Sequence, residues 1–465
     1  MEVLGILLSL ILLITFAYRG FSVILFAPIF ALIAASMSNL PLMPSYTELF
    51  MAKGVTYVKS FFPIFMLGAV FGKVMEQTGM AQSIAHEVIQ RLGKKRVVLA
   101  VCVAGMILSY GGISMFVCVF AIYPFASAMF KEAQIPKRLL PSCIVLGVFC
   151  STMDAFPGSP QIQNIIPSTY LGTSLYSAPI LGTIGGIFLI VVGYLFIEWR
   201  VHVAMAASEG YGNHTRNESI IDENAVIPPW QLSVLPLLTV LVVNALMTFV
   251  YQWDPALLNA FHEMKLPLVA ASVKNAITIW ALIIGLVTAI VLAAITGYKY
   301  IPKTSSLKEA LNLGALGSLL AIMNTASEVG YGNVIASLPG FKIIAQSLLG
   351  VGMSAPLFNE AVMVNILAGI TGSASGGMAI ALDIFGKHWL ELTAAQGIPP
   401  EVVHRVASMA SGGLDTLPHN GAIITLLAVC GLTHRESYND IFGLTCLKIV
   451  TAFLVVGLYM LTGIV

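Results

Sequence analysis

Long apolar runs, broken at intervals by short polar stretches, set the pattern of this chain of 465 residues. A membrane-spanning helix needs about 20 mostly apolar residues to cross a hydrocarbon core of about 30 Å. A transmembrane β-strand would alternate apolar and polar residues, so continuous runs predict helices and not a barrel. Eight segments fit a spanning helix: 3–18, 21–38, 60–76, 178–198, 229–251, 276–297, 311–328 and 441–464.

The composition supports this prediction. Hydrophobic residues make up 58% of the chain and charged residues 10%, against about 25% charged in a soluble domain. That balance excludes a solvated enzyme, a nucleic-acid binder and a disordered chain. We therefore expect an all-α polytopic membrane protein, with the lipid bilayer and no nucleic acid among its partners.

Neither the cysteines nor the start of the chain points to a catalytic or metal site. The six cysteines lie in apolar stretches without a Cys-x-x-Cys pair, so we expect buried, inert thiols and no metal site or cofactor. The chain begins Met-Glu, and no basic region precedes the first apolar run and no small-residue cleavage site follows it. We interpret that run as a retained span and not as a signal peptide.

A polar stretch divides the chain into two related halves. Residues 199–226 form the predicted extramembrane linker, between a first half at 1–198 and a second half at 227–465. Three pairs of short motifs recur in the same order in both halves, which indicates an internal repeat. The pairs are Lys73–Gly79 with Thr325–Gly330, Ile135-Pro136 with Ile398-Pro399, and Met153–Ser159 with Leu414–Asn420.

Each half also contains an apolar segment that is interrupted by a glycine-rich tip. These segments are about 97–130, interrupted at 109–114, and about 353–390, interrupted at 371–377. The arm 97–108 reaches only about 18 Å as a helix, which is too short to cross the membrane. We therefore predict re-entrant helical hairpins, whose non-helical tips are surrounded by protein or line a cavity.

The charges beside the hairpins indicate opposite orientations. Seven basic residues flank the first hairpin on both sides, which predicts that both flanks are cytoplasmic. This basic bias is absent around the second hairpin, so we expect it to enter from the opposite face. Two related halves of opposite topology form an inverted repeat, which is typical of secondary transporters. The basic flanking residues are Arg91, Lys94, Lys95, Arg96, Lys131, Lys137 and Arg138, against Lys342, Lys387 and Arg405 in the second half.

A helix interrupted by an Asp-x-x-Pro element follows each hairpin. The predicted broken helices cover about 137–172 and about 400–432. Pro157, Pro160 and Pro418 remove backbone donors, so both helices should unwind near the membrane midplane. An unwound helix presents N–H groups to a carboxylate on one side and carbonyls to a cation on the other.

Asp154 and Asp415 are the strongest individual candidates, and we assign them to ion coupling. An ionisable residue inside an apolar span costs free energy, so its presence favours a function. The alternative is that each aspartate only caps the half-helix that follows it. Glu328, Asn359 and Glu360 are weaker candidates, and we expect Glu328 to lie near a helix end.

Polar groups at the tips and breaks are the predicted substrate ligands. Hydroxyls and amides there suit a hydroxy acid, and glycines let the backbone approach it closely. For the serines the alternative is a helix-breaking role, and for the histidine a packed, hydrogen-bonded one. The predicted substrate-binding residues are Ser109, Gly111, Gly112, Ser114, Ser373, Ser375, Gly376, Thr416, His419 and Asn420.

Two stretches carry a family resemblance. Ser411-Gly-Gly-Leu-Asp-Thr-Leu-Pro-His-Asn-Gly-Ala422 and Cys430-Gly-Leu-Thr-His-Arg-Glu-Ser-Tyr438 resemble the gluconate permease (GntP) family of the ion-transporter superfamily. They look most like its D-3-hydroxybutyrate branch. The resemblance implies a scaffold and a mobile transport domain, a homodimer, an elevator motion, and cation-coupled import of a hydroxy-carboxylate across the bacterial cytoplasmic membrane.

In such carriers the site lies at hairpin tips and unwound helices, here 109–114, 152–159, 371–377 and 411–420. No lysine or arginine lies within these segments, which favours a small monocarboxylate over a dicarboxylate. The coupling ion is a proton or sodium, and two aspartates and a histidine favour the proton. Gluconate or a related sugar acid is the alternative substrate, and a passive channel the alternative mechanism. An enzyme is disfavoured because the chain has neither Gly-x-Gly-Asp nor His-Glu-x-x-His, and an ATP-driven pump because it has no phosphate-binding loop.

Overall fold

The computed structural model is helical throughout the part of the chain that it describes, and no β-strand occurs there. It describes residues 2–19, 21–93, 96–113, 115–214, 226–265, 270, 272–302, 306–341, 343, 355–418 and 420–465. Six helical stretches among these are long and apolar enough to cross a membrane, which confirms the predicted class of fold. They are Leu42–Gln77, Pro179–Ala206, Trp230–Phe249, Val273–Tyr300, Leu307–Ser337 and His434–Thr462.

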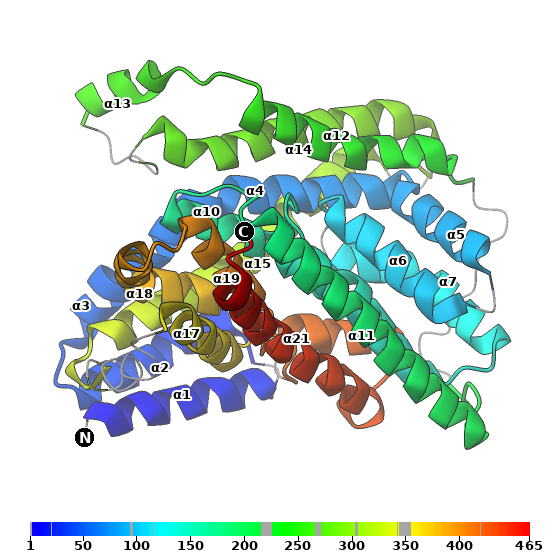
Figure 1. Cartoon of the computed structure of the whole chain (residues 1–465), viewed down its shortest axis with the longest axis horizontal. Helices are drawn as coiled ribbons and strands as arrows, with labels where there is room; N and C mark the ends of the chain where they lie inside the picture. The colour runs from blue at the N-terminus through cyan, green and yellow to red at the C-terminus, as the bar shows by residue number, and fades with distance from the viewer. Residues whose placement is uncertain are drawn as a thin grey trace.

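The first two predicted spans fold as shorter helices. Helix α1 (Glu2–Tyr18) has 17 residues and α2 (Val23–Met37) has 15, less than the about 20 that a perpendicular span needs. Both pack at one end of the molecule, beneath α17 and α18 in Figure 1. Each of the remaining predicted spans overlaps one of the six long stretches, and 178–198, 229–251 and 441–464 extend past its ends by one or two residues.

The two halves have the same order of elements. Each has a long helix, a pair of helices joined by a short turn, an interrupted helix and a second long helix (Figure 1). In the first half these are α4 (Ala52–Gln77), α6 (Val97–Tyr110) with α7 (Met115–Glu132), the segment 137–171, and α11 (Pro179–Ala206). In the second they are α15 (Leu307–Ser337), α17 (Pro356–Thr371) with α18 (Ala374–Ala395), the segment 400–430, and α21 (His434–Thr462).

Further helices precede or connect these units. They are α3 (Leu42–Pro44) with the π-helix Ser45–Met51, α5 (Met80–Leu92), α12 (Trp230–Phe249), α13 (Asn259–Glu263) and α14 (Val273–Gly297). Helices α12 and α14 pack on each other and form one edge of the molecule (Figure 1).

Both interrupted helices unwind at their Asp-x-x-Pro elements. The first consists of a 3₁₀ turn (Lys137–Leu139), α8 (Leu140–Ile144), a π-helical turn (Val145–Phe149), α9 (Ser151–Asp154) and, after the break, α10 (Ile162–Leu171). The second consists of α19 (Pro400–Ser411) and α20 (Gly421–Cys430). Proline lacks the N–H that would continue the ladder, and each break contains at least one proline: Pro157 and Pro160 in the first, and Pro418, preceded by Gly412 and Gly413, in the second.

Packing between the halves is reciprocal. Helix α10 packs against α18 of the second helix pair, and α20 packs against α7 of the first. Helices α4 and α15 run antiparallel, since Gly54 faces Ala326 while Gly314 faces Val70. Helices α11 and α21 pack together across the front of Figure 1. This exchange leaves Asp154 and Asp415, one from each break, almost wholly buried.

The structure contradicts one expectation about exposure, the burial of all six cysteines, and adds detail on the linker and on Lys137. Helix α11 continues to Ala206, so the predicted linker 199–226 begins as helix, and 215–225 lie outside the described residues. Lys137, counted among the basic flank, is fully buried with its Nζ 5.5 Å from the ring centroid of Tyr123. Cys446 is exposed, whereas the other five cysteines are buried as expected.

Candidate functional site

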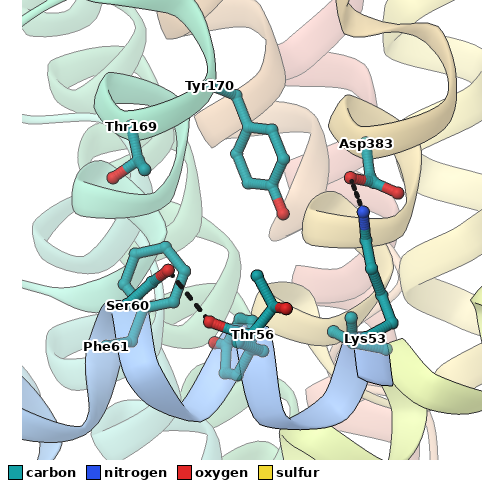
Figure 2. Close-up of a pocket in the computed structure, with 9 residues that line it drawn as sticks. Lys53, Thr56, Ser60, Phe61, Thr169, Tyr170 and Asp383 are labelled. Atoms are coloured by element: carbon teal, nitrogen blue, oxygen red, sulfur yellow. Dashed lines mark hydrogen bonds and ion pairs between the residues drawn. The ribbon is translucent and has the colours of Figure 1, made fainter. Parts of the chain in front are cut away.

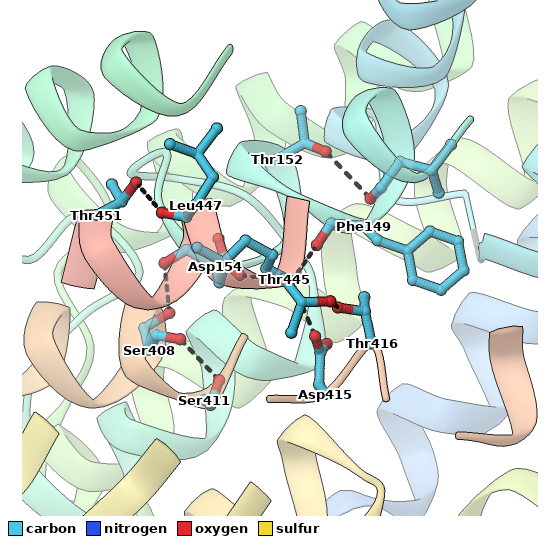
Figure 3. Close-up of polar contacts among 12 residues, drawn as sticks. Phe149, Thr152, Asp154, Ser408, Ser411, Asp415, Thr416, Thr445, Leu447 and Thr451 are labelled. Carbon is cyan, nitrogen blue, oxygen red and sulfur yellow. Dashed lines mark hydrogen bonds and ion pairs between the residues drawn. The ribbon is translucent and has the colours of Figure 1, made fainter. Parts of the chain in front are cut away.

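Two aspartates, one from each break, share a single lysine. Lys448 lies in the middle of α21, and its Nζ donates to Asp415 Oδ1 at 2.9 Å and lies 3.5 Å from Asp154 Oδ2. The same ammonium donates to the carbonyl of Phe149, at 2.9 Å, at the end of the π-helical turn. All three charged side chains are almost wholly buried. Figure 3 shows Asp154 and Asp415 converging on this point beside Phe149.

Adjacent glycines allow this close approach. A Cβ on Gly412 would overlap Asp154 Oδ2, and a Cβ on Gly413 would overlap Asn365 Oδ1. The break in the second helix therefore needs residues without side chains at these two positions. Asn365 Oδ1 is buried without a hydrogen-bond partner, so an unused acceptor lies against the same break.

The capping interpretation of the aspartates is wrong. The N-cap of α10 is Gln161, which makes no side-chain cap bond, and Asp154 instead lies at the end of α9. The N-cap of α20 is Asn420, whose Oδ1 accepts from Ala422 N at 2.7 Å. Because neither aspartate caps the half-helix that follows it, the structure leaves both available as charged partners of Lys448.

Arg405 holds the first break from the opposite half. Its guanidinium donates to the carbonyls of Ser177 at 2.7 Å and Asp154 at 3.4 Å, and to Asn164 Oδ1 at 3.1 Å. Asn164 Oδ1 also contacts His404 Nε2, at 3.1 Å. Since an amide oxygen only accepts, the network places the His404 proton on Nε2. These contacts link α19 of the second half to the unwound backbone of the first.

The first predicted tip is tied to the first break. Ser109 Oγ donates to the Val148 carbonyl at 3.2 Å and is wholly buried, and Gln161 Nε2 donates to the Ser109 carbonyl at 2.6 Å. Gly111 packs against Leu237, and Gly112 has a φ of +89°, which favours glycine. The Ser109 hydroxyl is thus engaged with protein. Ser114 lies outside the described residues.

The second tip is tied to the second break. Asn420 Nδ2 donates to the Gly372 carbonyl at 2.8 Å. Ser373 caps α18 by accepting from Gly376 N at 3.1 Å, and its Oγ is 3.3 Å from that of Ser375. Gly376 abuts the carboxylate of Glu328.

Two predicted substrate residues of the second break remain. Thr416 is fully buried, with its hydroxyl 2.6 Å from that of Thr445, so it faces protein. His419 lies outside the described residues.

Two more carboxylates are buried nearby, and the expectation for one of them is wrong. Glu328 lies well inside the 31-residue helix α15, not near its end, and its Oε2 has no hydrogen-bond partner. Neither oxygen of Glu360, which is fully buried on α17, has a partner. Its neighbour Asn359 accepts from Trp389 Nε1 at 3.0 Å. In the described ranges no three His, Cys, Asp or Glu side chains form a cluster suited to a metal ion.

Comparison with known proteins decides the family. The model of the GntP family permease matches residues 1–412 of the chain. The chain belongs to the GntP permease family. It is 47% identical, over the full length of both chains, to an uncharacterized transporter of Bacillus subtilis, YxjC. This GntP permease is thus a multi-pass membrane transporter and not an enzyme.

Other relatives match parts of this GntP permease. It is 33% identical over 105 residues to the high-affinity gluconate transporter of Escherichia coli, covering 22% of this chain and 23% of that one. It is 31% identical over 150 residues to the Gnt-II system L-idonate transporter of the same organism, covering 31% and 33%. The YdaH transporter of Alcanivorax borkumensis shares the fold, with a TM-score of 0.56 at 15% identity over 88% of both chains.

The site predicted from the sequence did not include Lys448 or Arg405, the two buried cations of the GntP permease that contact its breaks. The sequence argument that no lysine or arginine lies in the four segments is literally correct, but Lys448 and Arg405 reach the segments from outside them. Lys448 is an ionisable residue inside an apolar span, which is the signal that singled out the aspartates. Arg405 was counted with a polar flank, whereas its side chain is fully buried.

Proposed function

We propose that this GntP permease is a proton-coupled symporter that imports a small hydroxy-monocarboxylate, with D-3-hydroxybutyrate as the first candidate. The observation that carries the proposal is the shared lysine between Asp154 and Asp415. Within ion-pair distance there are two carboxylates and one ammonium, because Arg405 contacts the backbone carbonyl of Asp154 and not its carboxylate, so the ion-paired groups have one negative charge in excess. A charge buried in a medium of low dielectric is costly, so the cluster favours uptake of one cation.

The geometry favours a proton over sodium. The ammonium of Lys448 already lies between the two carboxylates, where a metal ion would need to be in order to contact both. Hard cations bound by proteins take several oxygen ligands around one centre. A proton needs no such space and binds either carboxylate oxygen directly.

The substrate assignment draws on the resemblance and on the site. The half-helix α10 begins at the first break without a side-chain cap, so its N-terminal N–H groups suit a single carboxylate, whereas Asn420 already accepts from the first N–H groups of α20. The alternative substrate is gluconate or a related sugar acid. The names of the two partial relatives from Escherichia coli, transporters of gluconate and L-idonate, support that alternative. A passive facilitator is the remaining alternative.

An elevator mechanism with inverted repeats completes the proposal. The repeated order of elements and the reciprocal packing of α10 with α18 and of α20 with α7 support two related halves. Apolar side chains exposed along α12 and α14 suit lipid or a second copy of the chain. We infer a homodimer in the bacterial cytoplasmic membrane, in which a scaffold holds a moving transport domain.

Uptake into proteoliposomes tests the function. Purified protein is reconstituted, and labelled D-3-hydroxybutyrate or gluconate is supplied under an imposed pH gradient or an imposed sodium gradient. Accumulation of D-3-hydroxybutyrate above equilibrium under the pH gradient alone is the expected result. Accumulation driven by sodium alone refutes the proton, and equilibration without accumulation indicates a facilitator. Accumulation of gluconate alone would transfer the proposal to the sugar-acid alternative.

A further inference from the structure

Glu360 is a buried carboxyl group that the Asp154–Lys448–Asp415 cluster does not use. It is the fifth residue of α17, and its side chain is fully buried. Neither of its oxygen atoms has a hydrogen-bond partner in the described part of the chain, and neither has room beside it for a water molecule. In Glu328, by comparison, only one oxygen is in this position. The Glu360 carboxyl is therefore enclosed by protein that offers it no donor.

No positive charge compensates the Glu360 carboxyl. Helix α17 packs against α1, α18, α19 and α21. Among the described residues, no charged side chain lies near enough to act on this carboxyl. Asp383 of α18 pairs instead with Lys53 of α4, at 2.7 Å (Figure 2), and Lys448 of α21 pairs with the two aspartates of the cluster.

The titratable and charged groups on these packed helices all lie elsewhere than at Glu360. None of the side chains described on α1 is acidic or basic. The groups on the other three helices are Asp383, Lys387, His388 and Glu391 on α18, Glu401, His404 and Arg405 on α19, and His434, Arg435, Glu436, Tyr438, Asp440, Cys446, Lys448 and Tyr459 on α21.

An ionised carboxylate at this position would have neither a donor nor a counter-ion. A charge in such surroundings is so costly that the group takes up a proton instead. Packing alone does not require a carboxyl here, because the fifth residue of α6 in the first helix pair is Val101, which is fully buried. An ionisable residue kept where an apolar one would pack favours a function.

The position of Glu360 links its proton to movement of the second helix pair. One residue earlier, Asn359 accepts from Trp389 Nε1 of α18 at 3.0 Å. Further along α17, Asn365 lies against Gly413 in the second break. The carboxyl can ionise only when water or a donor reaches it, and α17 must leave this packing for that to happen. Because the proton stabilises one position of α17 and not the other, its binding shifts the equilibrium between them.

We propose that Glu360 is a second proton-binding site of this permease, which holds its proton while α17 is packed as here and releases it when the second helix pair moves. The step is the transfer of one proton from the carboxyl oxygen of Glu360 to water, and its reverse. For its role in coupling, the inference rests on the proposed function and deepens it: the cluster couples the obligatory proton, and Glu360 adds one more per substrate.

Infrared spectroscopy of the full-length protein in lipid vesicles detects this proton directly. A carboxylic acid without a hydrogen bond has its C=O stretching band at a higher frequency than a hydrogen-bonded acid, and the band shifts when deuterium replaces the proton. We expect this band in wild type, its shift in D₂O, and its loss in Glu360→Gln, which keeps the shape of the side chain. Glu391→Gln is the matched control and should keep the band, because Glu391 is exposed on α18. A wild-type spectrum without the band, or a band that never shifts in D₂O, overturns the inference.

Glu360→Met provides a second variant without the acid. Methionine has a similar length and no polar group to leave unpaired, so we expect this variant to unfold at the wild-type temperature or above it. It should lack the infrared band as well. A band that persists in both Glu360→Gln and Glu360→Met belongs to another residue and overturns the inference.

Uptake into proteoliposomes tests the coupling. At a gradient of one pH unit and zero membrane potential, each coupled proton raises the limiting accumulation about tenfold. Glu360→Gln should therefore accumulate the transported acid, D-3-hydroxybutyrate or gluconate, about tenfold less than wild type and Glu391→Gln. Equal accumulation in all three overturns the inference, even if the proton drives uptake. If wild type accumulates neither acid under the pH gradient, the proposed function fails, whereas the infrared band and its shift still decide whether Glu360 holds an exchangeable proton.

Discussion

Replacing Lys448 with methionine tests the central cluster most simply. The change removes the ammonium that lies 2.9 Å from Asp415 and 3.5 Å from Asp154, and keeps a side chain of similar length. Breaking a buried ion pair by removing one partner costs about 3–5 kcal/mol, because it leaves an uncompensated charge. We therefore expect Lys448→Met to unfold at a clearly lower temperature than wild type.

A second substitution should reverse much of that loss. Asp415→Asn in the Lys448→Met background removes one uncompensated charge and should restore part of the stability. Asp154→Asn should restore less, because the Arg405 guanidinium, 3.4 Å from the Asp154 carbonyl, still compensates part of the Asp154 charge when Lys448 is absent.

Thermal unfolding can be followed through the protein's own cysteines. Five cysteines are buried, so a thiol-reactive dye reports unfolding, and Cys446 gives a constant background. Lys274→Met serves as control, because Lys274 is exposed near the start of α14. If Lys448→Met unfolds at the same temperature as Lys274→Met, or if neither asparagine restores stability, the three groups do not form an ion-pair cluster and the reasoning is wrong.

Three further substitutions test the architecture around the cluster. Gly412→Ala places a Cβ against the Asp154 carboxylate, and the displaced carboxylate should reduce uptake at least about tenfold. Gly421→Ala is the control and should leave uptake unchanged, because a Cβ at Gly421 meets open space. Asp440→Asn removes the buried carboxylate that pairs with two arginines, at 2.5 and 2.7 Å, and should cost about 3–5 kcal/mol in thermal unfolding; a loss under 1 kcal/mol would contradict this. Asn420→Ala removes the cap of α20 and should cost about 1 kcal/mol, and an unchanged unfolding temperature would refute the cap.

The pattern of apolar residues predicted most of the fold, because residues within each helix determine where that helix begins and ends. The long helices follow from apolar length, and the breaks follow from prolines that cannot continue a hydrogen-bond ladder. The π-helical turn at Val145–Phe149 has no such local signal. It depends on packing against α6, where Gly147 approaches the Cys102 backbone.

The site was predictable only in part, because its charges are contributed by distant segments. Asp154 and Asp415 stand out through their motif, but their partner Lys448 lies on a helix that begins after the second break. Arg405 reaches the first break across the interface between the halves. Contacts of this kind depend on which helix faces which, and a single sequence does not contain that information. The serine hydroxyl at position 109 looked available for a ligand, whereas the fold uses it within the protein.

The most direct test of coupling compares two modes of transport in one variant. Proteoliposomes contain wild type or Asp415→Asn. For counterflow they are loaded with unlabelled D-3-hydroxybutyrate and diluted into labelled D-3-hydroxybutyrate. For net uptake, empty vesicles receive labelled substrate and an inward proton gradient. Counterflow needs binding and movement but no net proton transfer. The account predicts that Asp415→Asn retains counterflow and loses gradient-driven accumulation. Accumulation by Asp415→Asn to the wild-type level would contradict the claim that this cluster couples the cation to the substrate.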